Sequence, residues 1–122
     1  MNALRVLAEN YVALWNEPDP QRRRASVAAL WAEDAIHRTP SIQAQGHTAI
    51  EARLLGAYER WVRDRGCEFV VIDEVSGHHD VVRLRWAMRN KQDGATLSIG
   101  SDVLLMDDAG RIRFDYQFIE SN

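Results

Sequence analysis

An arginine pair and an aspartate flank a predicted β-hairpin in the C-terminal half of the chain. Residues 83–102 read RLRWAMRNKQDGATLSIGSD, and the Asp93-Gly94 step is typical of a two-residue hairpin turn. With that turn Arg85 lies opposite Asp102, and with a turn two residues longer Arg83 does. A carboxylate oriented by a guanidinium can take a proton or hold a water molecule, which makes this pair a candidate for acid/base chemistry. The alternative is an ion pair with only a structural role.

Histidine and aromatic residues supply the next candidates. The imidazole of His37 titrates near neutral pH and suits proton transfer. On a short strand Ile36 and His37 point to opposite sides, so only one of them faces inward. Aromatic residues at helical spacing form either core or cavity wall, and they are Tyr11, Trp15, Trp31 and Tyr58.

No metal or cofactor site is predicted. His78, His79 and Asp80 are adjacent in a turn and have no third ligand at metal-binding spacing. Cys67 is the single cysteine, and no glycine-rich phosphate loop occurs. The sequence therefore predicts chemistry without a metal or a cofactor.

Three helices followed by a strand meander must position these residues. Apolar spacing predicts helices over 3–16, from 20 to about 31, and over 48–65. A short strand around Ile36 and a loop over 41–47 separate the second and third helices. Alternating patterns then predict strands over 68–76, 81–90, 95–106 and 111–120. This order predicts one α+β domain over 1–122, with a curved antiparallel sheet and helices on one face.

The two faces of the predicted sheet differ in polarity. Because side chains alternate along a strand, Arg83, Arg85 and Asp102 share one face, together with Asp115 and Gln117. The other face is apolar and includes Leu84, Trp86, Ile99, Val103, Phe114 and Tyr116. Either the apolar face packs on the helices, or the polar face lines an internal pocket.

Composition excludes several partner classes. Hydrophobic residues make up 46% of the 122 residues and the net charge is −3, with charges of both signs interspersed. The chain lacks a basic patch for nucleic acid, a membrane-spanning stretch and a targeting segment. We therefore expect a cytoplasmic protein that binds neither nucleic acid nor membrane.

Several strings resemble the nuclear transport factor two-like superfamily, the cone-shaped α+β fold of ketosteroid isomerases and SnoaL-like polyketide cyclases. They are the first-helix segment 11–15, LWAEDAIHRTP at 30–40, QGHTAIEA at 45–52, VRLRW at 82–86 and GSDVLLMDDAGRIRF at 100–114. The resemblance implies that the three helices pack on the concave face of the sheet and enclose a pocket. It also implies that the face with Arg83, Arg85 and Asp102 lies inside, and that the apolar face joins two copies in a homodimer.

The resemblance also implies roles for single residues. Tyr11 and Asp102 match the two residues that donate hydrogen bonds to the reacting oxyanion in ketosteroid isomerases. The general base of those enzymes precedes a proline, and Thr39 stands at that position before Pro40, so steroid isomerisation is not expected. Limonene epoxide hydrolases of this superfamily use an Asp-Arg-Asp set, which suggests Asp102 as base or water-holder and Arg85 as its partner.

These observations predict a small-molecule-binding SnoaL-like domain with cofactor-independent acid/base chemistry of the cyclase, isomerase or hydrolase type. Asp102, Arg85 and His37 are the predicted catalytic residues. The predicted substrate contacts are Tyr11, Trp15, Trp31, Tyr58, Arg83, Asp115 and Gln117. The alternative is a non-catalytic ligand-binding or dimeric assembly module in which the Arg-Asp pair is structural.

Overall fold

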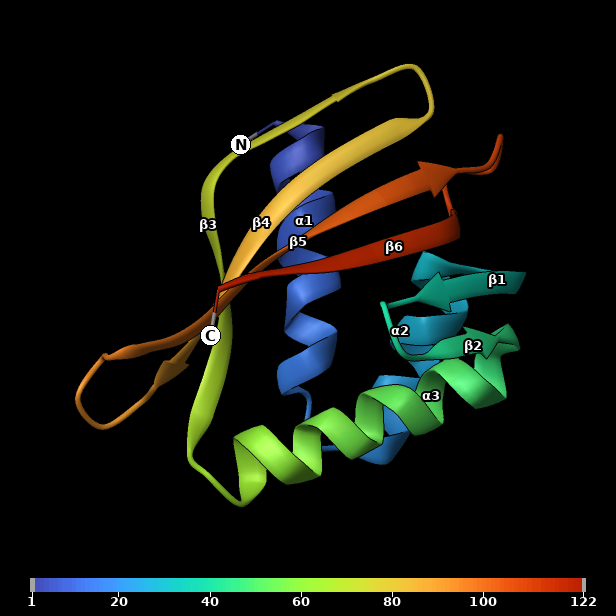
Figure 1. Cartoon of the computed structure of the whole chain (residues 1–122). Helices are drawn as coiled ribbons and strands as arrows, with labels where there is room; N and C mark the ends of the chain where they lie inside the picture. The colour runs from blue at the N-terminus through green and yellow to red at the C-terminus, as the bar shows by residue number, and fades with distance from the viewer. Residues whose placement is uncertain (1, 122) are drawn as a thin grey trace.

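A curved, open sheet of six strands forms one layer of the fold, and the helices cover its inner face (Figure 1). The computed structural model describes residues 2–121. Its helices are α1 (Ala3–Asn16), α2 (Pro20–Leu30) and α3 (Gly46–Ala57), and a π-helical turn, η1 (Tyr58–Arg63), continues α3. Its strands are β1 (Trp31–Arg38), β2 (Gln43–Gln45), β3 (Cys67–His78), β4 (Val81–Asn90), β5 (Thr96–Met106) and β6 (Ile112–Ser121).

The strand order is β2-β1-β6-β5-β4-β3. The β3–β6 meander is antiparallel, as predicted, but β1 runs parallel to β6, so the sheet is mixed. The segment 41–47, predicted as a loop, contains β2, which pairs with β1. The α+β class and the packing of the helices against one face are confirmed.

Local signals explain where the helices begin. Asn2 caps α1, because its side chain accepts a hydrogen bond from the backbone N–H of Arg5. Asp19 caps α2 in the same way and Pro20 follows at the first helical position.

The second helix ends at Leu30, one residue earlier than predicted. Trp31 is therefore the first residue of β1 and is fully buried in the core. Among the described residues, no helix has the length and apolar character needed to cross a bilayer.

The register of the β4–β5 hairpin differs from the prediction. The turn is longer than the Asp93-Gly94 step alone, because the backbone N–H of Asn90 donates to the carbonyl of Ala95. Arg89 pairs with Thr96, but Met88 pairs with Ser98, which leaves Leu97 as an extra residue on β5. Such a bulge moves every later side chain to the other face relative to its partner strand.

The bulge places Leu84 opposite Asp102 and Arg85 opposite Ser101. The predicted pairing of Asp102 with Arg85 or Arg83 is therefore wrong, and so is the prediction that all three share a face. Asp102 lies on the inner face with Leu84 and Trp86, whereas Arg83 and Arg85 point outward. A second irregularity between β5 and β6 brings Asp115 and Gln117 to the inner face as well.

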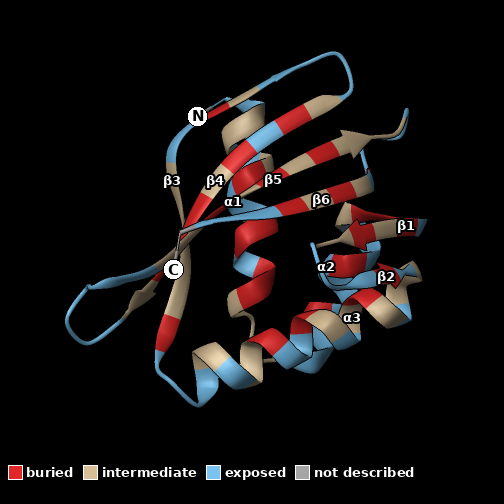
Figure 2. Cartoon of the chain, in the orientation of Figure 1, coloured by how far each residue is buried: buried red, intermediate tan, exposed pale blue. Residues whose placement is uncertain are grey.

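The predicted apolar face is consequently divided between the two sides of the sheet. Leu84 is 1% exposed and Trp86 is 6% exposed, because both pack beneath the helices. These two residues cannot belong to a surface that joins two copies. The other members of the predicted face remain outside, partly exposed, on β5 and β6, and they are Ile99, Val103, Phe114 and Tyr116. Figure 2 shows the buried residues concentrated on α1, on α3 and along the strands.

Helix α1 also contacts the free edge of the sheet. The side-chain amide of Asn16 donates to the carbonyl of Phe69 across 2.8 Å and accepts from the N–H of Phe69 across 2.8 Å. Farther along β3, a terminal nitrogen of Arg5 donates to the carbonyl of Asp73. The helix thus pairs with part of the edge strand in the manner of a neighbouring strand.

Candidate functional site

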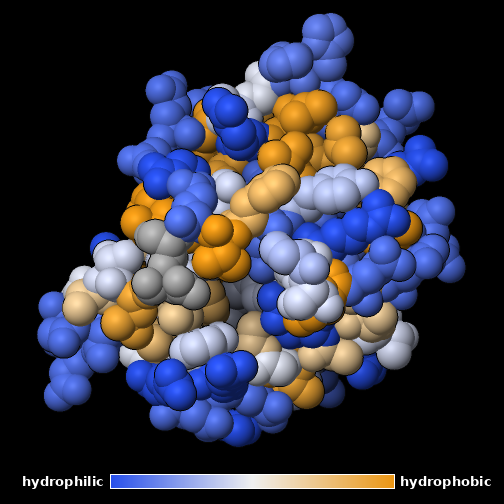
Figure 3. All heavy atoms as spheres, viewed as in Figure 1, coloured by the Kyte–Doolittle hydropathy of each residue, from blue (hydrophilic) through white to orange (hydrophobic). Residues whose placement is uncertain are grey.

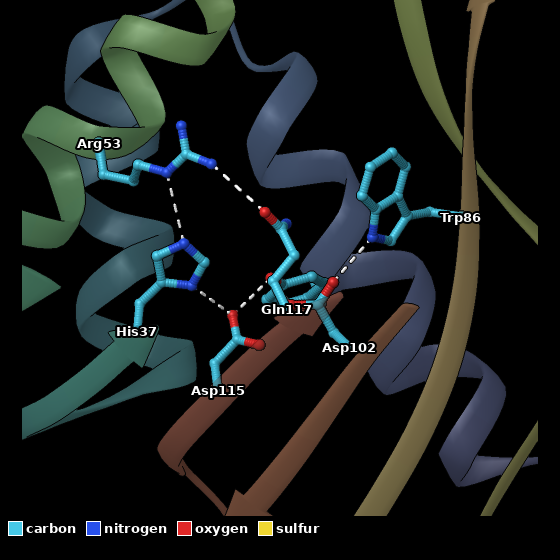
Figure 4. Close-up of polar contacts among 7 residues, drawn as sticks. His37, Arg53, Trp86, Asp102, Asp115 and Gln117 are labelled. Carbon is cyan, nitrogen blue, oxygen red and sulfur yellow. Dashed lines mark hydrogen bonds and ion pairs between the residues drawn. The ribbon is translucent and has the colours of Figure 1, made fainter. Parts of the chain in front are cut away.

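The hydroxyl of Tyr11 lies between two buried carboxyl groups. Its oxygen is 2.5 Å from Oδ2 of Asp115 and 2.8 Å from Oδ2 of Asp102. Tyr11 comes from α1, Asp102 from β5 and Asp115 from β6, and each is 1% exposed or less. The indole of Trp86 donates to Oδ1 of Asp102 across 2.8 Å. Figure 4 shows the labelled side chains of this network converging from the sheet and the helices.

Counting protons determines the state of the two carboxyl groups. A phenol has one hydrogen and can donate to only one of the two carboxyl oxygens. The other carboxyl must carry a proton of its own and donate it to the Tyr11 oxygen. The 2.5 Å contact to Asp115 has the length of a hydrogen bond to a carboxylate, whereas 2.8 Å is ordinary for a neutral pair. We therefore assign the chain of donors as Asp102 to Tyr11 to Asp115.

The electrostatic environment favours the same assignment. Burial, reinforced by the charge of Asp115, holds the pKa of Asp102 well above its ordinary value. Burial also raises the pKa of Asp115, but only to about 6, because hydrogen bonds from its neighbours and the charge of Arg53 favour its carboxylate. Burial and the two adjacent carboxyl groups raise the pKa of Tyr11, which disfavours a phenolate. At neutral pH the network holds a neutral Asp102, a neutral Tyr11 and an ionised Asp115.

His37 extends the network toward α3. Its Nδ1 lies 2.8 Å from Oδ2 of Asp115, and its Nε2 lies 3.4 Å from Nε of Arg53. A guanidinium can only donate, so Nε2 is the acceptor and Nδ1 carries the proton that it donates to Asp115. Burial, with the charge of Arg53 as a smaller cause, lowers the pKa of His37 to about 4. The imidazole is therefore neutral at neutral pH.

Arg53, on α3, contacts the network through His37 and Gln117. Its Nη2 donates to Oε1 of Gln117 across 3.3 Å, and its guanidinium lies 5.2 Å from the centre of the Trp15 ring. The His37 ring joins Arg53 to Asp115, since its two nitrogens contact one of them each. Arg53 thus connects the buried carboxylate to the helical layer.

A glycine makes room for the Trp86 indole. Gly100 lies directly opposite Trp86, and a Cβ at Gly100 would lie 2.2 Å from an atom of the indole ring. A side chain at that position would therefore displace the ring and its N–H from Asp102. The glycine allows the indole to lie flat across β5.

A cavity of about 410 Å³ opens between the inner face of the sheet and the helices α1 and α3. The face drawn in Figure 3 is hollowed near its centre, between the sheet and the helical layer. Most of the wall is aromatic or aliphatic and includes Trp15, Trp61, Phe69, Trp86 and Met88. Polar groups reach the cavity from Tyr11, Arg53, Arg65, Ser98 and Gln117. Asp102, Asp115 and His37 lie behind this wall, and Tyr11 connects the carboxyl groups to the cavity.

The structure separates the predicted site residues into three groups. Tyr11, Trp15 and Gln117 line the cavity, and Asp102, Asp115 and His37 form the network behind it. Arg83, Arg85, Trp31 and Tyr58 neither line the cavity nor take part in the hydrogen bonds of the network.

Each residue of the last group has other surroundings. Arg85 pairs on the outer face with Asp73 and with Glu120. Arg83 is exposed on the same face. Trp31 is buried beside the network, with its ring centre 5.9 Å from that of Tyr11 and 6.1 Å from that of His37. The ring of Tyr58 packs against the guanidinium of Arg23.

Arg53 is a functional candidate that is absent from the predicted site residues. It lies three residues after Ile50 and one before Leu54, on the apolar stripe of α3. A cation within a buried stripe is unusual unless it has partners inside, and that pattern was the available signal.

His37, Asp102 and Asp115 also have the donor types of a metal site. One ligand atom of each lies within 4.8 Å of the others. However, hydrogen bonds already engage both imidazole nitrogens and three of the four carboxyl oxygens. Arg53 adds a positive charge beside this group. The donor set therefore fits a proton-sharing network better than it fits a divalent cation.

Comparisons with solved structures give close matches in fold. A crystal structure from Agrobacterium tumefaciens, described as a candidate isomerase of the SnoaL-like family, superposes with a TM-score of 0.90 at 30% identity. The match covers 99% of this chain and 100% of that one.

Two more distant structures share the fold. A candidate polyketide cyclase from Sinorhizobium meliloti matches with a TM-score of 0.68 at 15% identity, over 93% of this chain and 94% of that one. An NTF2-like protein of unknown function from an Exiguobacterium species matches with a TM-score of 0.72 at 16% identity, over 95% and 99% of the two chains. No protein-family model and no curated protein matches the sequence. The fold and the 30% identity over nearly the whole chain show that this protein belongs to the SnoaL-like family of the nuclear transport factor two-like superfamily.

Proposed function

We propose that this small-molecule-binding SnoaL-like domain is an enzyme that moves a proton on its ligand without a cofactor, with Tyr11 as the group in contact with the ligand. One observation carries the proposal: Tyr11 lines the cavity, and its hydroxyl is hydrogen-bonded to two buried carboxyl groups, to which we assign opposite protonation states. A phenol alone is too weak an acid and too weak a base for rapid exchange near neutral pH. Its two partners remove this limitation.

The relay proceeds through Tyr11 to Asp115. As the Tyr11 oxygen accepts a proton from a C–H or O–H group of the ligand, its own proton passes to Oδ2 of Asp115. The ligand becomes an anion, Tyr11 stays neutral and Asp115 becomes a carboxylic acid. Reversal of the two transfers at a different ligand atom returns the proton and completes an isomerisation. A base with a pKa of about 6 is suited to this role at neutral pH.

The remaining polar groups stabilise the charges of this relay. Asp102 donates to the Tyr11 oxygen and keeps the phenol hydrogen directed to Asp115. The guanidinium of Arg53 lines the cavity and offers positive charge to an oxyanion that forms on the ligand. In this scheme Asp115 is the base, and Asp102, which the sequence analysis favoured for that role, orients the phenol.

Proton exchange on a ketone tests the relay directly. We use 1-tetralone, a bicyclic ketone, and follow by NMR the exchange of its carbon-bound α-protons with D₂O. The protein should accelerate exchange over buffer, and Tyr11→Phe and Asp115→Asn should each reduce the acceleration by about 10²-fold or more. Tyr116→Phe is the matched control, because its hydroxyl binds Arg38 on the outer part of the sheet. Exchange that is equal with and without protein, or unchanged in Tyr11→Phe, would contradict the proposal.

A non-catalytic ligand-binding module is the second candidate. It is favoured by the position of Asp102, Asp115 and His37 behind the cavity wall, where they bond mainly with one another. In that case Tyr11→Phe should weaken ligand binding or stability while the wild-type protein leaves α-proton exchange unchanged.

A further inference from the structure

Two arginines provide the charged groups of the cavity wall. Arg53 comes from α3 and Arg65 follows η1, and no aspartate or glutamate lines the cavity among the described residues. Arg53 is partly buried and Arg65 is exposed. A wall with cations and no anions produces a positive potential over the cavity, which attracts an anionic ligand.

Both guanidiniums are held by aromatic rings rather than by carboxylates. Arg53 lies over the Trp15 ring at 5.2 Å, and Arg65 lies over the Trp61 ring at 4.9 Å. Both rings also line the cavity. Within residues 2–121, neither arginine forms an ion pair, and the hydrogen bonds of Arg53 go to the neutral groups of His37 and Gln117. In Figure 4 the other terminal nitrogen of Arg53 points away from these partners.

A neighbouring arginine outside the cavity wall, Arg63, does pair with carboxylates. Arg63, on η1 but outside the cavity wall, pairs with Glu59 at 3.1 Å and with Asp64 at 2.8 Å. The helix end therefore contains acids, but they pair with an arginine that does not line the cavity. The arginines of the wall have no carboxylate partner, and the second terminal nitrogen of Arg53 keeps its N–H groups available for a ligand.

We infer that the ligand of this cavity is an organic carboxylate whose apolar body packs against the aromatic wall and whose anionic group binds Arg53 and Arg65. Guanidinium and carboxylate match in geometry and form charge-assisted hydrogen bonds. A ligand carboxylate would also compensate the partly buried charge of Arg53. This inference rests on the proposed function for the identity of the site, and it adds the chemical class of the substrate.

Matched ligands that differ in charge test the inference. The probes are 2-naphthylacetate, 2-naphthylacetamide and 2-(2-naphthyl)ethylamine, and their binding is measured by calorimetry at neutral pH and low salt. The carboxylate should bind at least about tenfold more tightly than the amide, and the amine most weakly. Higher salt should reduce the preference.

Arginine variants test which residues cause the preference for the carboxylate. Arg65→Gln and Arg53→Gln should each lower the affinity for the carboxylate by about tenfold and leave that for the amide nearly unchanged. Arg63→Gln, which removes an exposed and paired arginine, should leave both affinities as in the wild type. Equal binding of carboxylate and amide, preference for the amine, or no binding of the carboxylate would each overturn the inference.

The outcomes also separate this inference from the proposed function. If the amide binds as well as the carboxylate while Tyr11→Phe abolishes ketone exchange, the substrate class is wrong and the relay stands. If the carboxylate preference depends on Arg65 while Tyr11→Phe leaves exchange unchanged, the relay is wrong and the anion site stands.

Discussion

The hydroxyl oxygen of Tyr11 lies 2.5 Å from Oδ2 of Asp115, so a carboxylate that is fully buried in β6 bonds directly to a residue that lines the cavity. The chemistry of the site therefore depends on a base that the ligand does not contact.

Asp115→Asn should change how stability depends on pH. Burial raises the pKa of Asp115 from 3.8 to about 6, so between these values the folded state binds more protons than the unfolded state and stability falls as pH rises. His37 acts oppositely: burial lowers its pKa from 6.5 to about 4, and stability rises with pH across that window. The two contributions oppose each other in the wild type, whereas Asp115→Asn retains the rising one.

Urea unfolding at a series of pH values measures this effect. The difference in unfolding free energy between Asp115→Asn and the wild type should shift in favour of the variant as pH rises from about 4 to 6. The shift should be on the order of 1.4 kcal/mol for each pKa unit by which folding displaces Asp115. Parallel pH profiles for the two proteins would show that Asp115 is not perturbed in the folded state.

Asp102→Asn should preserve the network and the proton exchange. An asparagine amide can donate to the Tyr11 oxygen and accept from the Trp86 indole, as a protonated Asp102 does. Stability at neutral pH should stay within about 1 kcal/mol of the wild type, whereas Asp102→Ala leaves buried partners unsatisfied and should cost about 1–3 kcal/mol. Thermal unfolding and the 1-tetralone assay measure both effects. Loss of exchange in Asp102→Asn would instead make Asp102 the base.

Two aliphatic substitutions test which face of the sheet packs on the helices. Leu84 is 1% exposed beneath the helices, so Leu84→Ala should cost about 2–5 kcal/mol in the free energy of unfolding. Val103 is partly exposed on the outer face, and Val103→Ala should cost about 1 kcal/mol or less. Urea denaturation compares them, and similar costs would contradict the observed register.

A homodimer through the outer face of the sheet remains a prediction. Ile99, Val103, Phe114 and Tyr116 lie on this face, and Phe118 beside them is 52% exposed. Burial of these side chains against a second copy would remove apolar surface from water.

Sedimentation velocity tests the dimer. The wild type should sediment as a dimer and Val103→Glu as a folded monomer, because a carboxylate would be buried in the interface. Gln21→Glu, on the exposed surface of α2, should remain dimeric. A monomeric wild type would contradict the prediction.

The fold could be predicted because its signals are local and repeated. Proline and cap residues define the starts of α1 and α2, and alternation defines the four long strands. The register could not be predicted, because the extra residue at Leu97 has no distinctive chemistry. A shift by one residue moved Arg85 away from Asp102 and Leu84 to the inside.

The site was predicted only in part, because some of its contacts join segments that are distant in the sequence. The resemblance to the superfamily, rather than the predicted pairing, favoured an inner position for Tyr11 and Asp102, and the structure brings them together with Asp115, His37 and Gln117. Arg53 was missed because its role depends on a contact between α3 and β1, segments whose packing no local pattern specifies.

The bond between Asn16 and Phe69 has a consequence beyond the stability of a single molecule. An uncovered edge strand offers unpaired N–H and C=O groups to any other extended chain, and such templates promote intermolecular β-sheet growth and aggregation. The amide of Asn16 already occupies both groups of Phe69, and Arg5 occupies the carbonyl of Asp73. The first helix therefore also protects this edge against strand addition by other molecules.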